Sequence, residues 1–92
     1  PSVQVALRDD ATANRFGVGA VVTARFADGT AQMREVQLGG GFASFDEPVA
    51  HFGLGAQREV AALEVRWPTG ETVRLEGPFA AGARYEVRRA RR

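Results

Sequence analysis

Hydrophobic and polar residues alternate along most of this chain, and a two-residue period is typical of β-strands with one buried face. Within residues 3–7, Val3, Val5 and Leu7 share one side of such a strand. Within residues 20–26, one side is entirely apolar and carries Ala20, Val22, Ala24 and Phe26. Both segments are therefore predicted to be strands whose apolar side chains face a core.

A hairpin is predicted after the second of these segments, because the Asp28-Gly29 pair suits a tight turn with positive φ. In the strand that follows, Met33 lies on the phase expected to face the core, whereas Val36 lies on the opposite phase. A one-residue slip of this kind indicates a β-bulge, which we expect near Arg34-Glu35.

The later segments repeat the same alternation after three glycines at 39–41 interrupt it. Their inward-facing sets are predicted to be Phe52 and Leu54, then Leu63, Val65 and Trp67, then Val73 and Leu75, and last Tyr85 and Val87. Residues 56–63 could form at most one helical turn. The pattern predicts an all-β fold, a small antiparallel β-sandwich or barrel of about seven short strands.

Composition places residues 1–92 in a single domain, with the core at 3–88 and a basic tail at 89–92. Cysteine is absent, which excludes disulfides, thiolate zinc sites and a cysteine nucleophile. No apolar run approaches the length of a membrane span, so we expect no membrane insertion. Since the chain starts at Pro1, we expect it to be an excised piece of a longer protein.

The basic residues are all arginine, which we attribute to a GC-rich, bacterial genome. Arg88, Arg89, Arg91 and Arg92 fall within the last five positions, after the last expected strand. A nucleic-acid surface would interleave such residues with aromatics. We therefore expect a solvated end or the start of a linker, and no nucleic-acid partner.

Catalytic chemistry is not predicted. Ser44, Asp46 and His51 lie within eight residues of one another, but the serine lacks the G-x-S-x-G context of a nucleophile elbow. With a single histidine and no calcium-loop spacing of acids, the fragment is expected to bind no metal or cofactor. His51 should point away from Phe52 and Leu54, toward solvent or a packed loop.

Several motifs, in this order and spacing, resemble the ASPIC and UnbV family of domains. They are NRFGVGAVVT at 14–23, REV at 34–36, GGGFAS at 39–44, HFGLG at 51–55 and LEVRWPTG at 63–70. Two positions depart from the family pattern: Thr69 stands where serine is usual, and Phe45 where glutamine is common.

The resemblance implies a small β-domain without established catalytic residues. It implies a position C-terminal to FG-GAP-type propeller repeats, which would bind calcium outside this fragment, in a secreted or cell-surface protein. We accordingly expect an extracellular, periplasmic or cell-surface location. The family also includes enediyne-biosynthesis proteins.

Two functions of different class follow. The first is a non-catalytic interaction module that binds the neighbouring propeller domain, an extracellular protein or a glycan, through an exposed apolar or arginine-bearing patch. Its candidate binding residues are Asn14, Arg15, Ser44, His51 and Trp67. The second is an accessory domain of a biosynthetic enzyme, in which His51 lines a concave site beside a neighbour's active site.

These candidates also have structural roles that the sequence leaves open. Asn14 suits left-handed turn geometry, and Arg15 could pair with a carboxylate such as Glu35. Trp67 at a strand end could be core or a sugar-stacking platform. His51 could hydrogen-bond the loop that holds Ser44.

Overall fold

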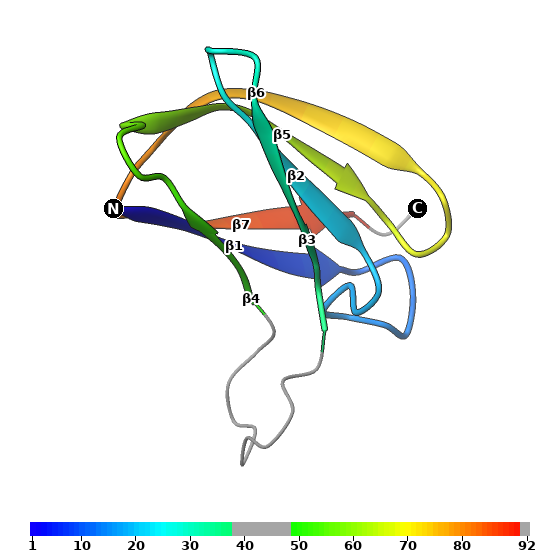
Figure 1. Cartoon of the computed structure of the whole chain (residues 1–92). Coiled ribbons are helices and arrows are strands. Elements are labelled where there is room, and N and C mark those ends of the chain that lie inside the picture. Colours follow the sequence, from blue (N-terminus) through cyan, green and yellow to red (C-terminus); the bar gives the residue numbers. More distant parts are fainter. Residues whose placement is uncertain (38–48, 91–92) are drawn as a thin grey trace.

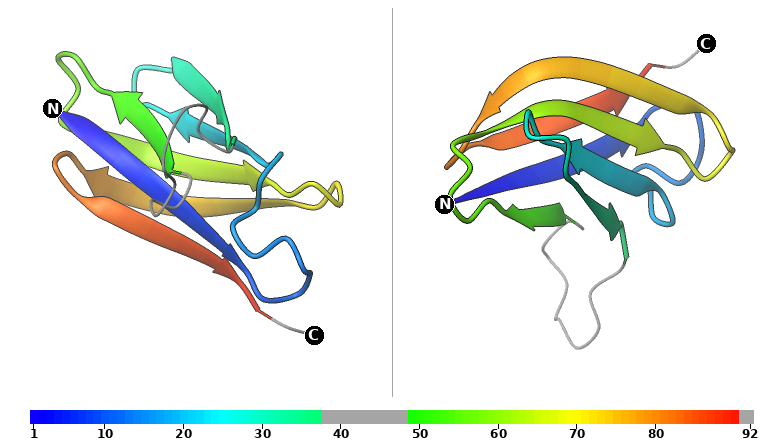
Figure 2. Two further views of the ribbon diagram at one scale, coloured as in Figure 1. Left: turned by 90° about the horizontal axis from the view of Figure 1, so that it is seen from below. Right: turned by 45° about the horizontal axis from the view of Figure 1, so that its top comes forward.

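The computed structural model describes residues 1–37 and 49–90. These residues form seven strands and no helix. The strands are β1 (Ser2–Asp9), β2 (Val21–Arg25), β3 (Ala31–Glu35), β4 (Val49–Gly53), β5 (Glu59–Arg66), β6 (Thr72–Ala80) and β7 (Arg84–Arg89). One sheet has the order β4-β1-β7 and the other β3-β2-β5-β6, and the two stack as layers (Figures 1 and 2). The prediction of a small all-β sandwich or barrel of about seven strands is confirmed, and the form observed is a two-layer sandwich.

The first and last strands of the chain lie side by side in the smaller sheet (Figure 2). β1 and β7 pair in parallel, whereas every other described pair is antiparallel. A parallel pair needs a long connection. Here the connection is the rest of the domain, so the β1–β7 pair ties the two ends of the fold together.

The core lies between the two sheets and consists of the residues that alternate inward on each strand. Val3, Val5 and Leu7 are fully buried, and Trp67 is 3% exposed. The buried cluster comprises Val3, Val5, Leu7, Ala20, Val22, Ala24, Phe26, Val36, Ala50, Phe52, Leu54, Val60, Leu63, Val65, Trp67 and Val87. Leu75 and Tyr85 pack against it, half-buried, whereas Val73 is 38% exposed. The alternation therefore predicted nearly all of the core.

The hairpin turn predicted at Asp28-Gly29 is present, and a second turn of the same kind follows Trp67. Gly29 adopts a φ of 91° and its N–H donates to the Phe26 carbonyl at 3.0 Å. Gly70 adopts a φ of 98° and its N–H donates to the Trp67 carbonyl at 2.8 Å. Glycine is the residue that takes up this left-handed geometry without steric cost.

The prediction for β3 was wrong in phase. Met33 is 64% exposed, and the β2–β3 register runs without a slip, so there is no bulge at Arg34-Glu35. Because Gln32 and Arg34 pair with buried residues of β2, their side chains take the inner phase, and Val36 follows in the same phase.

Long polar side chains fit this inner phase because β3 is an edge strand beside β4. The Gln32 amide donates to the Gly53 carbonyl at 2.8 Å, and the Arg34 guanidinium lies 5.5 Å from the centre of the Phe52 ring. Their stems cover the core while their polar ends reach the rim.

The basic end of the chain also differs from expectation. β7 extends through Arg89, so Arg88 and Arg89 are strand residues, and the Arg89 side chain is only 11% exposed. The prediction of a solvated tail was therefore wrong for these two residues. Residues 91 and 92 lie outside the described residues, as do the glycines at 39–41 and Ser44.

A close backbone approach occurs where β6 crosses a bulge in β5, between Val60 and Ala62. A Cβ added at Gly77 would lie 2.7 Å from the carbonyl oxygens of Val60 and Ala61. Such a contact is too short for any side chain, so the backbone of one strand would have to move. Glycine at this position permits the two strands to pair through the bulge.

We predict that Gly77→Ala lowers the free energy of unfolding by about 1–3 kcal/mol, the usual range for overpacking. Chemical denaturation with urea measures this loss. Gly53→Ala is the matched control, because a Cβ there meets nothing within 4 Å. Equal stability of the two variants would contradict the prediction.

Candidate functional site

The sequence-predicted site residues do not come together in one place. Asn14 and Arg15 lie in the loop that follows β1, whereas His51 on β4 pairs with Gln4 near the start of β1. The strand between these points rises by about 3.3 Å per residue, so the two regions are at opposite ends of the sheet. His51 is exposed, as predicted from its phase opposite Phe52. Ser44 lies outside the described residues.

A buried ion pair connects the ends of β1 and β7, where Asp9 and Arg89 are register partners. The Arg89 Nε donates to Asp9 Oδ1 at 3.0 Å and its Nη2 donates to Asp9 Oδ2 at 2.5 Å. Asp9 is 1% exposed. This fork-to-fork geometry is the strongest that a guanidinium and a carboxylate adopt, and it fixes both side chains.

Arg89 also covers the only tryptophan of the chain. Its guanidinium carbon lies 4.7 Å from the centre of the Trp67 ring, within the range of a cation–π contact. Its Nη1 donates to Thr69 Oγ1 at 2.8 Å and lies 3.7 Å from Glu71 Oε2. The burial of Trp67 and this cover favour its core role over a sugar-stacking platform.

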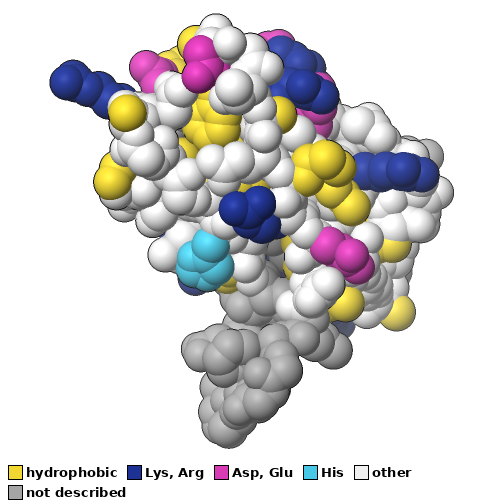
Figure 3. Space-filling view, in the orientation of Figure 1, with side chains coloured by type: hydrophobic (Ala, Val, Ile, Leu, Met, Phe, Trp, Pro, Cys, Tyr) yellow, Lys and Arg dark blue, Asp and Glu magenta, His cyan; other side chains and the backbone are white. Residues whose placement is uncertain are grey.

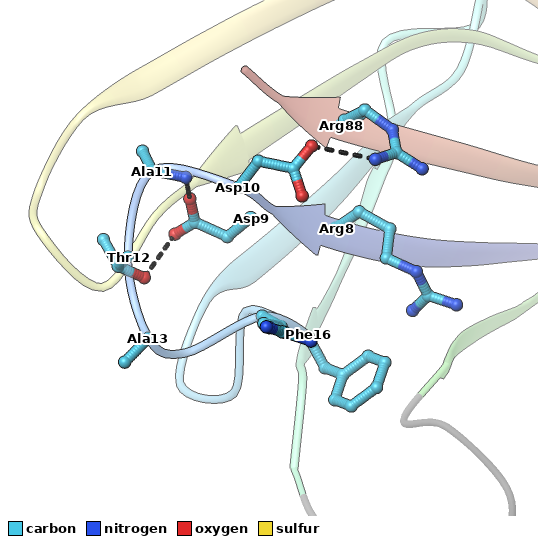
Figure 4. Close-up of a pocket in the computed structure, with 9 residues that line it drawn as sticks. Arg8, Asp9, Asp10, Ala11, Thr12, Ala13, Phe16 and Arg88 are labelled. Carbon is cyan, nitrogen blue, oxygen red and sulfur yellow. Dashed lines mark hydrogen bonds and ion pairs between the residues drawn. The ribbon is translucent and has the colours of Figure 1, made fainter. Parts of the chain in front are cut away.

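Asp9 anchors the loop that follows it. Its carboxylate accepts hydrogen bonds from the Ala11 N–H at 2.9 Å and from the Thr12 hydroxyl at 3.0 Å (Figure 4). Its own N–H donates to the Arg15 carbonyl at 2.7 Å. The hydrogen bond from Arg89, with those from Ala11 and Thr12, lowers the pKa of Asp9 to about 2, although burial opposes the shift.

Asn14 closes the same loop. Its side-chain amide donates to the Val18 carbonyl at 2.8 Å, and its side-chain oxygen accepts from the Val18 N–H at 3.2 Å. The expected left-handed backbone at Asn14 was wrong, since in the described residues positive φ occurs only at glycines. In this loop it occurs at Gly17 and Gly19. Asn14 therefore holds the loop by side-chain hydrogen bonds, as in an Asx-type turn.

Arg15 and Phe16 stand at the outside of this braced loop. The expected pairing of Arg15 with Glu35 was wrong: both side chains are exposed and form no ion pair with each other. Phe16 is 38% exposed, and the Arg8 guanidinium lies 4.7 Å from the centre of its ring (Figure 4). An aromatic ring and arginines at a surface are enriched at protein interfaces.

These residues border a broad, open concavity of about 960 Å³ (Figure 4). Its lining consists of Arg8, Asp9, Asp10, Ala11, Thr12, Ala13, Arg15, Phe16 and Arg88. Arg8 and Arg88 are register partners on the outer side of β1 and β7. We call the surface formed by Arg8, Arg15, Phe16 and Arg88 the loop face.

Acidic side chains hold one arginine of the loop face in place. Arg88 Nη1 donates to Asp10 Oδ2 at 2.8 Å and its Nη2 donates to Glu86 Oε1 at 2.9 Å. These contacts raise the pKa of Arg88, Asp10 contributing most, so its charge is permanent at any physiological pH. Sequence reasoning identified Arg15 but missed Arg8, Phe16 and Arg88 as parts of one surface.

The other surfaces of the described residues have fewer features of an interaction site. A groove of about 230 Å³ between β6 and β7 is lined by Trp67, Val73, Leu75 and Val87 together with polar residues at its rim. The outer side of the larger sheet carries a ladder of ion pairs, in which Glu64 contacts both Arg25 at 2.8 Å and Arg74 at 3.1 Å. On the face in Figure 3, charges of both signs are dispersed among apolar side chains.

Histidine and acidic residues do not assemble into a recognisable centre. In the described ranges 1–37 and 49–90, no three such side chains are grouped closely enough to hold a metal ion. His51 lines neither the concavity of the loop face nor the β6–β7 groove. No helix able to cross a membrane was found in the described part of the chain.

Comparisons with known proteins agree with the motifs. A sequence model of the family described as ASPIC and UnbV matches residues 10–92. Cartilage acidic protein 1 of mouse and of human are each 42% identical to this chain over 62 residues, which is 64% of this chain and 9% of the relative. The same protein of Xenopus tropicalis is 43% identical over 56 residues, 61% of this chain and 8% of the relative.

This chain thus spans less than a tenth of the length of these curated relatives. No solved structure matches it.

We predict that stability falls in acid because of Asp9. Its pKa is lower in the folded chain, about 2, than the ordinary value of 3.8, so the stabilisation is complete above pH 4. It is lost as the pH falls from about 4 to 2, and amounts to roughly 2 kcal/mol. Urea denaturation at a series of pH values measures this slope. In Asp9→Asn the slope over that window should be smaller, and an unchanged slope would contradict the assignment.

Proposed function

The chain belongs to the ASPIC and UnbV family, and from that premise we propose that it is a non-catalytic interaction module that docks on a partner through the loop face. One observation carries the proposal. The loop between β1 and β2 is held by hydrogen bonds that involve the side chains of Asp9, Thr12 and Asn14. It nevertheless presents Arg15 and Phe16 to solvent. A loop fixed before binding loses little conformational entropy when it docks.

The partner that we propose is a neighbouring domain of the same protein. The short span of this chain relative to its curated relatives supports a role within a longer protein. The resemblance described above implies a calcium-binding FG-GAP-type propeller as that neighbour, in a secreted or cell-surface protein. Interfaces between domains of one chain are of moderate size and more polar than permanent ones, which suits a surface of arginines around one aromatic ring.

The alternative role as an accessory domain of a biosynthetic enzyme is less well supported. It requires His51 in a concave site, and His51 is instead an exposed residue of β4 away from the loop face. A glycan-binding role through Trp67 has the same weakness, because Trp67 is covered by Arg89.

We predict that amide hydrogens of residues 10–16 exchange at least about tenfold more slowly in the full-length protein than in the 92-residue chain alone. Docking buries the loop face and suppresses its local opening. Hydrogen–deuterium exchange followed by mass spectrometry measures both samples. Equal exchange in the two samples would overturn the proposal.

Side-chain variants assign the effect to the loop face. The double change Arg15→Ala and Phe16→Ala should abolish the slower exchange in the full-length protein without lowering the melting temperature of the isolated chain, since both side chains lie outside the core. His51→Ala is the control: it is also an exposed substitution, at the other end of the sheet, and should leave the slower exchange intact.

A further inference from the structure

The exposed charges of the loop face are mostly positive. Three arginines, Arg8, Arg15 and Arg88, line the concavity, against two exposed carboxylates: Asp10, which also lines it, and Glu86, which contacts Arg8 and Arg88 beside it. Asp9 also lines it, but its charge is buried and compensated by Arg89. Interfaces match positive to negative potential, so a complementary partner brings acidic groups to this surface.

Arg15 is the arginine of this surface that is most available to a partner. Arg8 contacts the Phe16 ring and Arg88 contacts Asp10 and Glu86, whereas the Arg15 side chain is exposed and takes part in none of the ion pairs of the described residues. Only its backbone is committed, through the carbonyl that accepts from Asp9. A guanidinium in this state can receive a carboxylate through two parallel hydrogen bonds.

A partner could place one carboxylate on Arg15 and a second on Arg88, but Asp10 already occupies the position beside the Arg88 guanidinium. It accepts one hydrogen bond from Arg88 at 2.8 Å, while Glu86 accepts from the other Nη atom at 2.9 Å. These bonds hold the Arg88 guanidinium beside Asp10 and Glu86. An incoming carboxylate competes with Asp10 for that guanidinium, so Asp10 sets the binding geometry and weakens the affinity at the same time.

We infer that the loop face binds a protein segment bearing spaced Asp or Glu residues, with Arg15 and Arg88 receiving carboxylates and Phe16 packing against an apolar side chain between them. The inference rests on the proposed docking function and names the chemistry of its partner.

A carboxylate-bearing peptide fits better than a densely sulfated glycan. One face of the Phe16 ring is covered by Arg8, which leaves less of the ring for stacking on a sugar. Asp10 and Glu86 stand among the arginines, so a closely charged polyanion meets like charges at short range. Separate carboxylates can reach Arg15 and Arg88 while an aliphatic side chain lies on Phe16.

The test is a titration of the 92-residue chain with the blocked peptide acetyl-Glu-Leu-Glu-Glu-Leu-Glu-amide, followed by amide chemical shifts in NMR. Shifts are expected at residues 10–16 and at Arg88, with affinity falling as sodium chloride rises. The same peptide with glutamine in place of every glutamate should bind at least about fivefold more weakly, by the size of one or two surface ion pairs.

Two variants change the affinity in opposite directions. Arg15→Gln should weaken binding about two- to fivefold, the range of one exposed ion pair. Asp10→Asn should strengthen it by a similar factor, because it removes the internal competitor, a gain that a purely structural role of Asp10 does not produce. Arg58→Gln is the matched control, an exposed arginine outside the loop face whose loss should change nothing.

Each remaining outcome overturns the inference. Equal binding of the glutamate and glutamine peptides would show that carboxylates are not recognised. Weaker binding by Asp10→Asn would show that Asp10 does not compete with the peptide for Arg88. Tighter binding of a heparin hexasaccharide at the same residues would identify a sulfated glycan instead. If the peptide fails while the full-length protein still protects residues 10–16, the inference about acidic chemistry is wrong and the docking function stands.

Discussion

The ion pair between Asp9 and Arg89 is the constraint on which the rest of this structure depends. It joins the last residue of β1 to the last residue of β7, so it clamps the two ends of the fold in parallel register. Removing either partner would leave a buried charge uncompensated, which in proteins is strongly destabilising. The same arginine covers Trp67, and the same carboxylate starts the loop after β1. The Asp9–Arg89 ion pair therefore contacts a core residue, joins two strands of the sheet and holds the start of the loop.

Because side chains alternate along β1 and β7, some residues at this end of the sheet face the core, and their neighbours form part of the loop face. Leu7, Asp9, Val87 and Arg89 take the inner phase and are buried or nearly so, whereas their neighbours Arg8 and Arg88 take the outer phase. The loop after β1 is divided in the same way. The Asn14 side chain hydrogen-bonds within the loop, whereas the Phe16 side chain is exposed. A surface supported in this way is rigid without having its own arginines buried, which is what an interaction site needs.

The fold could be predicted from the sequence because period-two alternation reports burial directly. It placed buried residues on five of the seven strands and the half-buried Leu75 on β6. It failed at β3, where an edge position lets Gln32 and Arg34 occupy the inner phase. The buried ion pair had a readable signal: Asp9 continues the inward phase of Val5 and Leu7, and an acid in a core position requires a partner. The proximity of Arg8 to Arg88 had no signal in the sequence, because it follows from the parallel pairing of the first and last strands.

The motifs that identify the family are mainly packing and turn devices. Phe52, Leu54 and Trp67 are core, Asn14 closes a loop, and a Cβ at Gly17 would lie 3.0 Å from Leu7 Cδ1. Arg15 and His51 are motif side chains without such a role in the described residues. His51 stands apart from the loop face, whereas Arg15 shares its surface with two further arginines and an exposed aromatic ring. Under the proposed docking function, a polar side chain that the fold does not use and that lies among others suited to an interface is the one expected to contact a partner. That expectation selects Arg15 over His51.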